Sequence, residues 1–146
     1  MYMDSLKANL VNLIPQAAVD WLLMVYQAIQ VFDDVADGDE IKRDDLNAVI
    51  WNTLVGIGQN PFFIANSQIL TPLVAAMILK WQASDTVERQ GKADAKSFNW
   101  RAGYYDLVLM AVQITRGTEF ATQNAHIVLG LYGENLDEYL GEFNHA

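Results

Sequence analysis

Cysteine is absent from this chain of 146 residues. A disulfide scaffold, a zinc ribbon, an iron–sulfur site and a thiol nucleophile are therefore excluded. Hydrophobic residues make up 52% of the sequence, which is enough to build a core without such a staple. A chain of this length is typical of one domain, so we expect a single compact domain over residues 1–146.

Basic residues are also scarce, because nine Lys and Arg stand against 18 Asp and Glu and give a formal charge of −9. Phosphate binding depends on Lys and Arg, so we expect no nucleic-acid partner. The acidic excess lies in residues 33–45 and 134–142, whereas acids and bases balance in the rest of the chain. The sequence therefore predicts a neutral body with two acidic ends.

Secretory and membrane signals are weak. The first residues, MYMDSLKANL, lack the basic and apolar regions of a secretory signal, so we expect a cytoplasmic protein. The segment Phe62–Leu79 approaches the hydropathy of a membrane span, but polar residues and Pro72 interrupt it. We interpret this segment as a pair of core helices and expect no membrane partner.

Alternating strand patterns and hairpin dipeptides are missing, and helical periodicity is present instead. One apolar stripe is formed by Leu46, Val49, Ile50, Leu54 and Ile57. Further helices are predicted over residues 16–37, 73–81, 98–116, 118–131 and 135–143. The sequence therefore predicts an all-α fold, a single compact multi-helix domain of five to seven helices. So many apolar helix faces in a small chain also indicate self-association, and we expect a homodimer.

Several residues predict where helices begin and end. Asp44 or Asp45 can cap the helix of the apolar stripe, and Gly58 can end it in a left-handed conformation. Asn60-Pro61 and Thr71-Pro72 are both typical helix starts, with a turn expected around residues 66–70. Residues 82–97 lose apolar periodicity, so we expect an exposed helix end and loop there. The tryptophans are expected to anchor the core. They are Trp21, Trp51, Trp81 and Trp100.

One acidic cluster could carry chemistry. Asp33, Asp34 and Asp37 close the first long helix, and helical spacing brings their carboxylates together. Acids at a helix C-terminus repel one another and the helix dipole, and a divalent cation such as Mg²⁺ would relieve both repulsions. These three residues are therefore the candidate metal ligands. No catalytic residue and no resident cofactor are predicted beside them.

At these residues the sequence resembles the aspartate-rich DDxxD motif of the isoprenoid synthase family. The resemblance implies an all-helical enzyme that holds Mg²⁺ against a substrate diphosphate. The chain departs from the family because it is about half the usual length and lacks a second such motif. Asp85 and Glu88 are the nearest second acidic pair, and Lys42-Arg43 only loosely matches the basic pair that often follows the motif.

A second interpretation of the same segment is a degenerate calcium loop. With Gly38 at the sixth position, Asp33 is first, Asp37 fifth and Asp44 twelfth, but Val35 at the third position offers no side-chain oxygen. A third interpretation is that the cluster continues the polar stripe of its helix and is solvated surface.

The sequence favours a non-enzymatic helical protein that acts through protein–protein contact, in the manner of small accessory or phage-encoded proteins. The alternatives are a Mg²⁺-dependent enzyme or binder of a diphosphate-type ligand and a calcium-binding loop. Among other candidates, His126 and His145 lack the companions of a metal site. Asp106 is expected to need a partner, which Lys80, Arg101 or a tyrosine hydroxyl could supply.

Overall fold

The computed structural model describes residues 2–143, of which helices cover 82% and strands none. The expected all-α fold is therefore confirmed, and these residues form eight helices when continuous runs are counted once, slightly more than the five to seven expected. The helices are α1 (Tyr2–Val11), α2 (Gln16–Asp37), α3 (Arg43–Trp51), the π-helix η1 (Asn52–Gly56), α4 (Ile57–Gln59), α5 (Pro61–Arg89), α6 (Ala95–Trp100), α7 (Tyr104–Arg116), α8 (Thr118–Leu129) and α9 (Leu136–Phe143). They form two compact units, Met1–Ser67 and Gln68–Ala146, which are described separately below.

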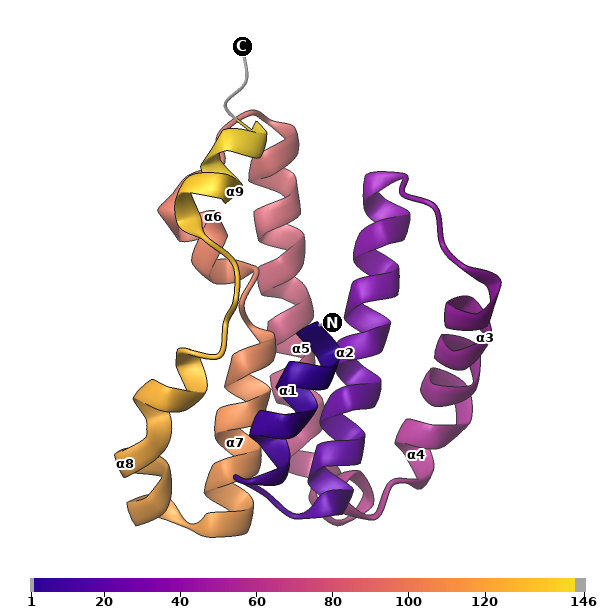
Figure 1. The fold of residues 1–146 in the computed structure, drawn as a ribbon, viewed down its shortest axis with the longest axis vertical. Coiled ribbons are helices and arrows are strands. Elements are labelled where there is room, and N and C mark those ends of the chain that lie inside the picture. Colours follow the sequence, from indigo (N-terminus) through magenta and orange to yellow (C-terminus); the bar gives the residue numbers. More distant parts are fainter. Residues whose placement is uncertain (1, 144–146) are drawn as a thin grey trace. The chain divides into compact units, whose positions relative to one another are not determined.

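Helix α2 is the centre of the first unit. It packs against α1 and, on another side, against the continuous run of α3, η1 and α4 (Figure 1). The residues of α2 that are buried follow the helical period expected for this segment. They are Ala18, Val19, Trp21, Leu22, Val25, Ala28 and Val31. Helix α2 has the predicted bounds, and Gly38 ends it in a left-handed conformation with φ 75°.

Trp21 anchors the aromatic part of this unit. Its ring lies parallel to that of Phe63 at a centroid distance of 6.1 Å, and tilted against Phe62 at 5.8 Å. Its expected role in the core is therefore confirmed. Trp51 was expected there too, but 68% of it is exposed. The prediction failed because α3 packs against α2 through Val49, and Trp51 lies on another side of α3 that none of the described helices of this unit covers.

Asn60 starts α5 as the Asn60-Pro61 pair predicted. Its side-chain oxygen accepts a hydrogen bond from the Phe63 backbone N–H at 3.0 Å, which caps the helix. Its Nδ2 donates to the Ala17 carbonyl of α2 at 2.9 Å. One buried side chain therefore both caps α5 and bonds the residue before its first turn to α2.

We expect the substitution Asn60→Ala to lower the free energy of unfolding by about 2 kcal/mol, because it removes a helix cap and a buried interhelical hydrogen bond. Urea unfolding followed by circular dichroism measures the change. Asn12→Ala is the matched control, since the exposed Asn12 directly follows α1 and its amide donates to the Ala8 carbonyl of that helix at 3.2 Å. Equal effects of the two substitutions would contradict this role of Asn60.

The run from Arg43 to Gln59 differs from its predicted ends. Lys42, rather than Asp44 or Asp45, occupies the N-cap position, and both acids lie in the first turn, where the helix dipole favours them. Gly58 does not end the run in a left-handed conformation. The helix continues through Gly58 because Asn60, two residues later, already provides the break and the next cap.

The predicted pair of helices in residues 60–81 is present as two helical stretches that join in one continuous run, α5, across a kink. The apolar stretch of α5 is only 17% buried, so the interpretation of these helices as core helices is wrong. Asn66 has non-helical angles (φ −127°, ψ 18°), at the start of the turn expected around residues 66–70. Its side-chain Nδ2 donates to the Phe62 carbonyl at 2.9 Å. Pro72 lies inside α5, where its ring and missing N–H bend a helix without necessarily ending it.

In the second unit, α7 and α8 form a hairpin, while α6 and α9 lie together (Figure 1). Gly117 separates α7 from α8 with φ 89°, as predicted. The single helix expected over residues 98–116 is instead divided into α6 and α7 by a turn at residues 101–103. Gly103 lies in this turn and packs closely against Met77. A Cβ added to residue 103 would lie only 3.2 Å from Met77 Cγ, so a side chain there would crowd Met77.

Candidate functional site

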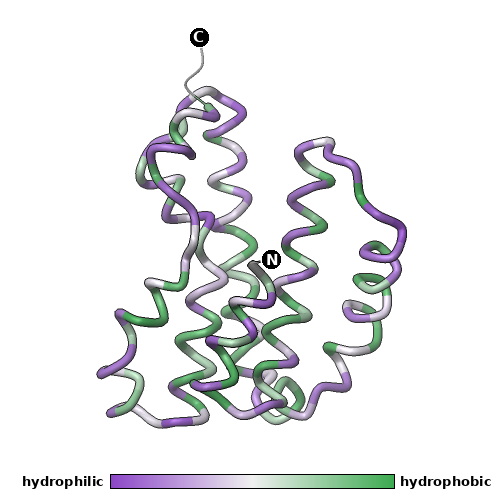
Figure 2. Tube along the Cα trace, in the orientation of Figure 1, coloured by the Kyte–Doolittle hydropathy of each residue, from purple (hydrophilic) through white to green (hydrophobic). Residues whose placement is uncertain are grey.

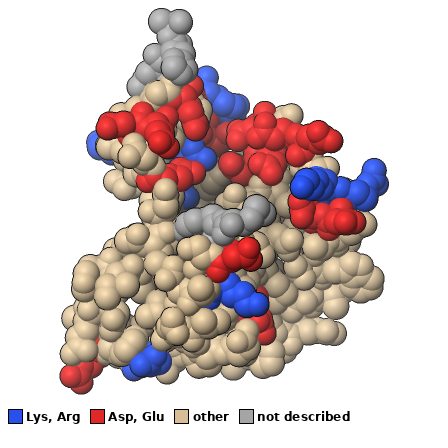
Figure 3. All heavy atoms as spheres, in the orientation of Figure 1, with Lys and Arg blue, Asp and Glu red and all other residues tan. Residues whose placement is uncertain are grey.

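The acidic cluster lies at the C-terminal end of α2. Asp33 and Asp34 are partly buried, and Asp37 is exposed. The Gly38 N–H donates to the Asp34 and Val35 carbonyls, so the glycine of the calcium-loop interpretation ends the helix. Figure 3 shows acidic side chains gathered on the surface where α2 ends and α3 begins.

Within residues 2–143, no three His, Asp or Glu side chains gather closely enough to hold a metal ion. Asp33, Asp34 and Asp37 are neighbours along α2 but do not form such a group, and metal binding there stays a prediction from sequence alone. Asp85 and Glu88 do not act as a second acidic pair. Asp85 accepts from Arg89 at 3.0 Å, whereas Glu88 belongs to the network described below.

We expect Asp34→Asn to change the free energy of unfolding by no more than about 0.5 kcal/mol, in the stabilising direction, because a charge at the negative end of the helix dipole is removed. Thermal melting at low salt, with and without Mg²⁺, Mn²⁺ or Ca²⁺, measures it. A cation at a hundred times its Kd would add about 2.7 kcal/mol. A metal-induced rise in Tm that Asp34→Asn abolishes would contradict the interpretation of this cluster as solvated surface.

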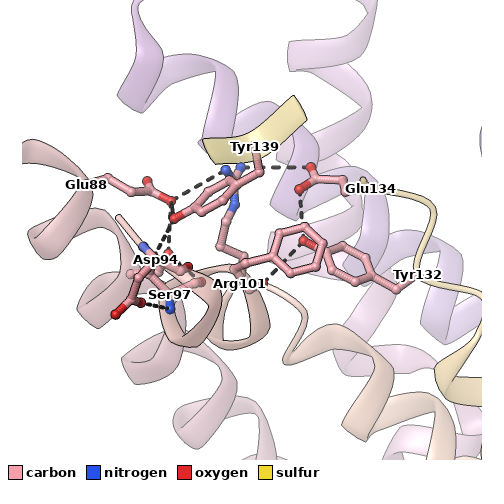
Figure 4. Close-up of polar contacts among 9 residues, drawn as sticks. Glu88, Asp94, Ser97, Arg101, Tyr132, Glu134 and Tyr139 are labelled. Atoms are coloured by element: carbon pink, nitrogen blue, oxygen red, sulfur yellow. Dashed lines mark hydrogen bonds and ion pairs between the residues drawn. The ribbon is translucent and has the colours of Figure 1, made fainter. Parts of the chain in front are cut away.

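A buried polar network in the second unit was not predicted from the sequence. Tyr139 of α9 is 2% exposed, and its hydroxyl donates to the Glu88 carboxylate of α5 at 2.7 Å (Figure 4). The same hydroxyl lies 2.7 Å from Ser97 Oγ of α6. Ser84 Oγ lies 3.0 Å from Glu88 and 2.9 Å from the Ser97 carbonyl, and it is placed to donate to either. Three helices are therefore joined through these side chains.

Arg101 provides the positive charge of this network. Its guanidinium lies 3.5 Å from Glu88 and 4.0 Å from Glu134, and its centre lies 5.2 Å from the Tyr139 ring centroid (Figure 4). The side chains of Arg101 and Glu88 are only 15% and 12% exposed. Tyr132 donates to Glu134 at 2.8 Å and so extends the network to the segment before α9.

The local sequence explains how α6 is placed. Asp94 caps α6 by accepting from the Ser97 N–H at 3.0 Å, and Ser97 Oγ accepts from the Asp94 N–H at 2.9 Å. This capping box buries Ser97 inside the segment 82–97 that was expected to be exposed. Ser84 and Ala93 of that segment are also buried, so the prediction of exposure is wrong for them.

The chemistry of the network favours structure over catalysis. Burial raises the pKa of the Tyr139 hydroxyl, the hydrogen bond from Ser97 lowers it, and acceptance by Glu88 raises it further, with a net increase. Burial and the hydrogen bond to Glu134 likewise raise the pKa of Tyr132. Both tyrosines therefore stay protonated as donors, and the fully buried Ser97 is closed to a substrate.

We expect stability to fall as the pH rises above about 10, because tyrosines of the unfolded chain ionise there, whereas the raised pKa values of Tyr132 and Tyr139 delay their ionisation in the folded state. The unfolded state then holds fewer protons, and each tyrosine costs up to about 1.4 kcal/mol per pH unit. Urea unfolding at pH 9 and pH 11 measures this loss. The double variant Tyr132→Phe, Tyr139→Phe should lose less than the wild type, and an equal loss would contradict the assignment.

The remaining candidates have simple roles. Asp106 pairs with Lys80, whose Nζ lies 2.9 Å from its carboxylate, as one of the expected partners. His126 is exposed on α8, and His145 lies outside the described residues. None of these placements indicates catalysis.

An exposed apolar surface of the first unit lies on α3 and η1. Five large apolar side chains are exposed there, with Trp51 and Leu54 exposed by 68% and 78%. We call this the Trp51 surface, and its residues are Leu46, Ile50, Trp51, Leu54 and Val55. Hydrophobic residues along this run and along α5 are visible in Figure 2.

No known protein family, curated protein or solved structure matches this chain.

Proposed function

We propose that this chain is a non-enzymatic helical protein of the cytoplasm that acts through protein–protein contact and self-associates. The observation that carries the proposal is the large amount of apolar surface left exposed. In α5, an 18-residue window has a mean hydropathy of 1.8, yet only 17% of it is buried. Large exposed apolar patches mark interaction sites in soluble proteins.

The charge distribution supports the same proposal. From Leu46 to Leu79 the sequence contains no Asp, Glu, Lys or Arg, and this stretch includes the Trp51 surface and most of α5. Apolar surface without charge favours contact with another apolar protein surface and disfavours nucleic acid. The two acidic segments, residues 33–45 and 134–142, give the chain its net charge of −9, which limits non-specific aggregation.

A lipid bilayer is the alternative partner for the exposed apolar surface of α5. Among residues 2–143, α5 is the one helix that is long and apolar enough to cross a membrane by length and composition. Its Asn66, Gln68 and Pro72 are costly in a bilayer core, and basic residues that would attract anionic lipids are absent from Leu46–Leu79. These features favour a protein partner over a membrane.

The Mg²⁺-dependent and calcium-loop alternatives depend on the sequence pattern around Asp33, Asp34 and Asp37. Within residues 2–143, no group of three His, Asp or Glu side chains is placed to hold a metal ion, so neither alternative gains support beyond the sequence pattern. Self-association therefore remains the better-supported proposal.

Light scattering at high micromolar concentration tests the proposal. We expect a mass of twice the 16.4 kDa chain, decreasing toward one chain on dilution. A monomer at all concentrations would overturn it, as would co-sedimentation with phosphatidylcholine vesicles in place of self-association.

A further inference from the structure

We propose that two copies of this chain pair through the Trp51 surface, with their α3–η1–α4 runs antiparallel about a two-fold axis near residues 50 and 51. This inference rests on the proposed self-association and adds its surface and direction. The occupant of the Trp51 surface is then the same surface of a second copy, as a two-fold contact requires.

The Trp51 surface is held rigidly from behind. Val49 is buried with Ala28 and Val31 of α2. In η1, the Asn52 Nδ2 donates to Gln27 Oε1 of α2 at 2.9 Å. A π-helical turn adds a residue to the usual turn, and such turns occur frequently at functional sites. The exposed side chains are therefore presented by a backbone that is already fixed, which lowers the entropy cost of binding.

The area of this surface is suited to a dimer. The five side chains are exposed by 37–78%, and together they expose on the order of 500 Å² of apolar surface, which is the size of patch that often marks a functional surface. A standard interface buries about 800 Å² on each partner, with a polar rim around an apolar centre. The Trp51 surface supplies that centre, and neighbouring polar residues such as Arg43, Asn47 and Gln59, all exposed, supply a rim.

Charge decides the direction of pairing. The residues that lead into α3 are acidic: residues 37–45 contain five acids, Asp37, Asp39, Glu40, Asp44 and Asp45, against Lys42 and Arg43. The other end of the run, Ile57–Asn60, carries no charge. A parallel pair would bring two acidic ends together, which is unfavourable. An antiparallel pair places each acidic end against an uncharged end.

The uncharged end also has room for a partner. Gly58 is exposed there, and a Cβ added to it would meet no atom within 4 Å. With the axis near residues 50 and 51, Arg43 of one copy lies opposite Gly58 of the other. Within one copy these residues are about 22 Å apart along the helix, at a rise of 1.5 Å per residue.

Disulfide trapping tests the geometry, because the chain has no cysteine of its own. Single variants Arg43→Cys, Gly58→Cys and Ile50→Cys are oxidised alone and in pairs, at a concentration where light scattering reports the dimer. Cysteines join only when their Cα atoms approach to within about 7 Å. We expect Arg43→Cys to link to Gly58→Cys in the mixture, neither to link to itself, and Ile50→Cys to link to itself. Gln123→Cys on α8 controls for random collision.

Each other result overturns the inference in a distinguishable way. Self-linking of Arg43→Cys would show a parallel pair. A dimer by light scattering without these links would place the contact on another surface and leave the proposed self-association intact. A monomer at every concentration would remove both proposals.

Discussion

Replacing Glu88 with alanine is expected to lower the free energy of unfolding by about 3–5 kcal/mol, as removal of one partner from a buried ion pair generally does. The Glu88 carboxylate accepts from Tyr139 at 2.7 Å, and it lies 3.0 Å from Ser84 Oγ and 3.5 Å from the Arg101 guanidinium. Alanine would leave these groups buried with fewer acceptors. Urea unfolding of the full chain measures the loss.

Asp85→Ala is the matched control on the same helix. Asp85 pairs with Arg89 at 3.0 Å, but the Arg89 side chain is 71% exposed, so solvent screens the pair. We expect that substitution to cost no more than about 0.5 kcal/mol. If Glu88→Ala were as mild as Asp85→Ala, the network would not hold α9 against α5 and α6.

Replacing Trp51 with serine is expected to weaken self-association at least about 30-fold, because a buried aromatic at the centre of an interface typically contributes 2 kcal/mol or more. The stability of the monomer should change little, since Trp51 is mostly exposed within one chain. Sedimentation velocity over a dilution series gives the dimer Kd, and thermal melting gives the stability.

Ile127→Ser on α8 serves as the control for loss of exposed apolar area. Ile127 is also exposed but lies outside the Trp51 surface. An equal weakening by both substitutions would indicate general hydrophobic association, and would count against a specific contact at Trp51.

Local signals in the sequence predicted much of the fold. The bounds of α2, the cap at Asn60 and the end of α7 at Gly117 follow from short-range rules for helix periods, caps and left-handed glycines. The predictions failed where tertiary packing decided the outcome. Gly103 is placed by its approach to Met77, and Gly58 is helical because Asn60 supplies the break.

The buried polar network could not be predicted because its members are far apart in sequence. Tyr139 and Glu88 are separated by 51 residues, and nothing near Tyr139 indicates that a carboxylate will meet it. One local signal was available, since Asp94 and Ser97 have the spacing of a capping box. The acidic cluster can be read from the sequence because its residues are neighbours in the chain, whereas the exposure of Trp51 depends on which side of α3 packs against α2.

The most direct measurement of the central claim is amide hydrogen exchange of the wild-type chain at low and high concentration. Contact through the Trp51 surface predicts that exchange slows with concentration in residues 43–59 and stays unchanged in α8. Slower exchange confined to another part of the chain, or no dependence on concentration, would contradict the account.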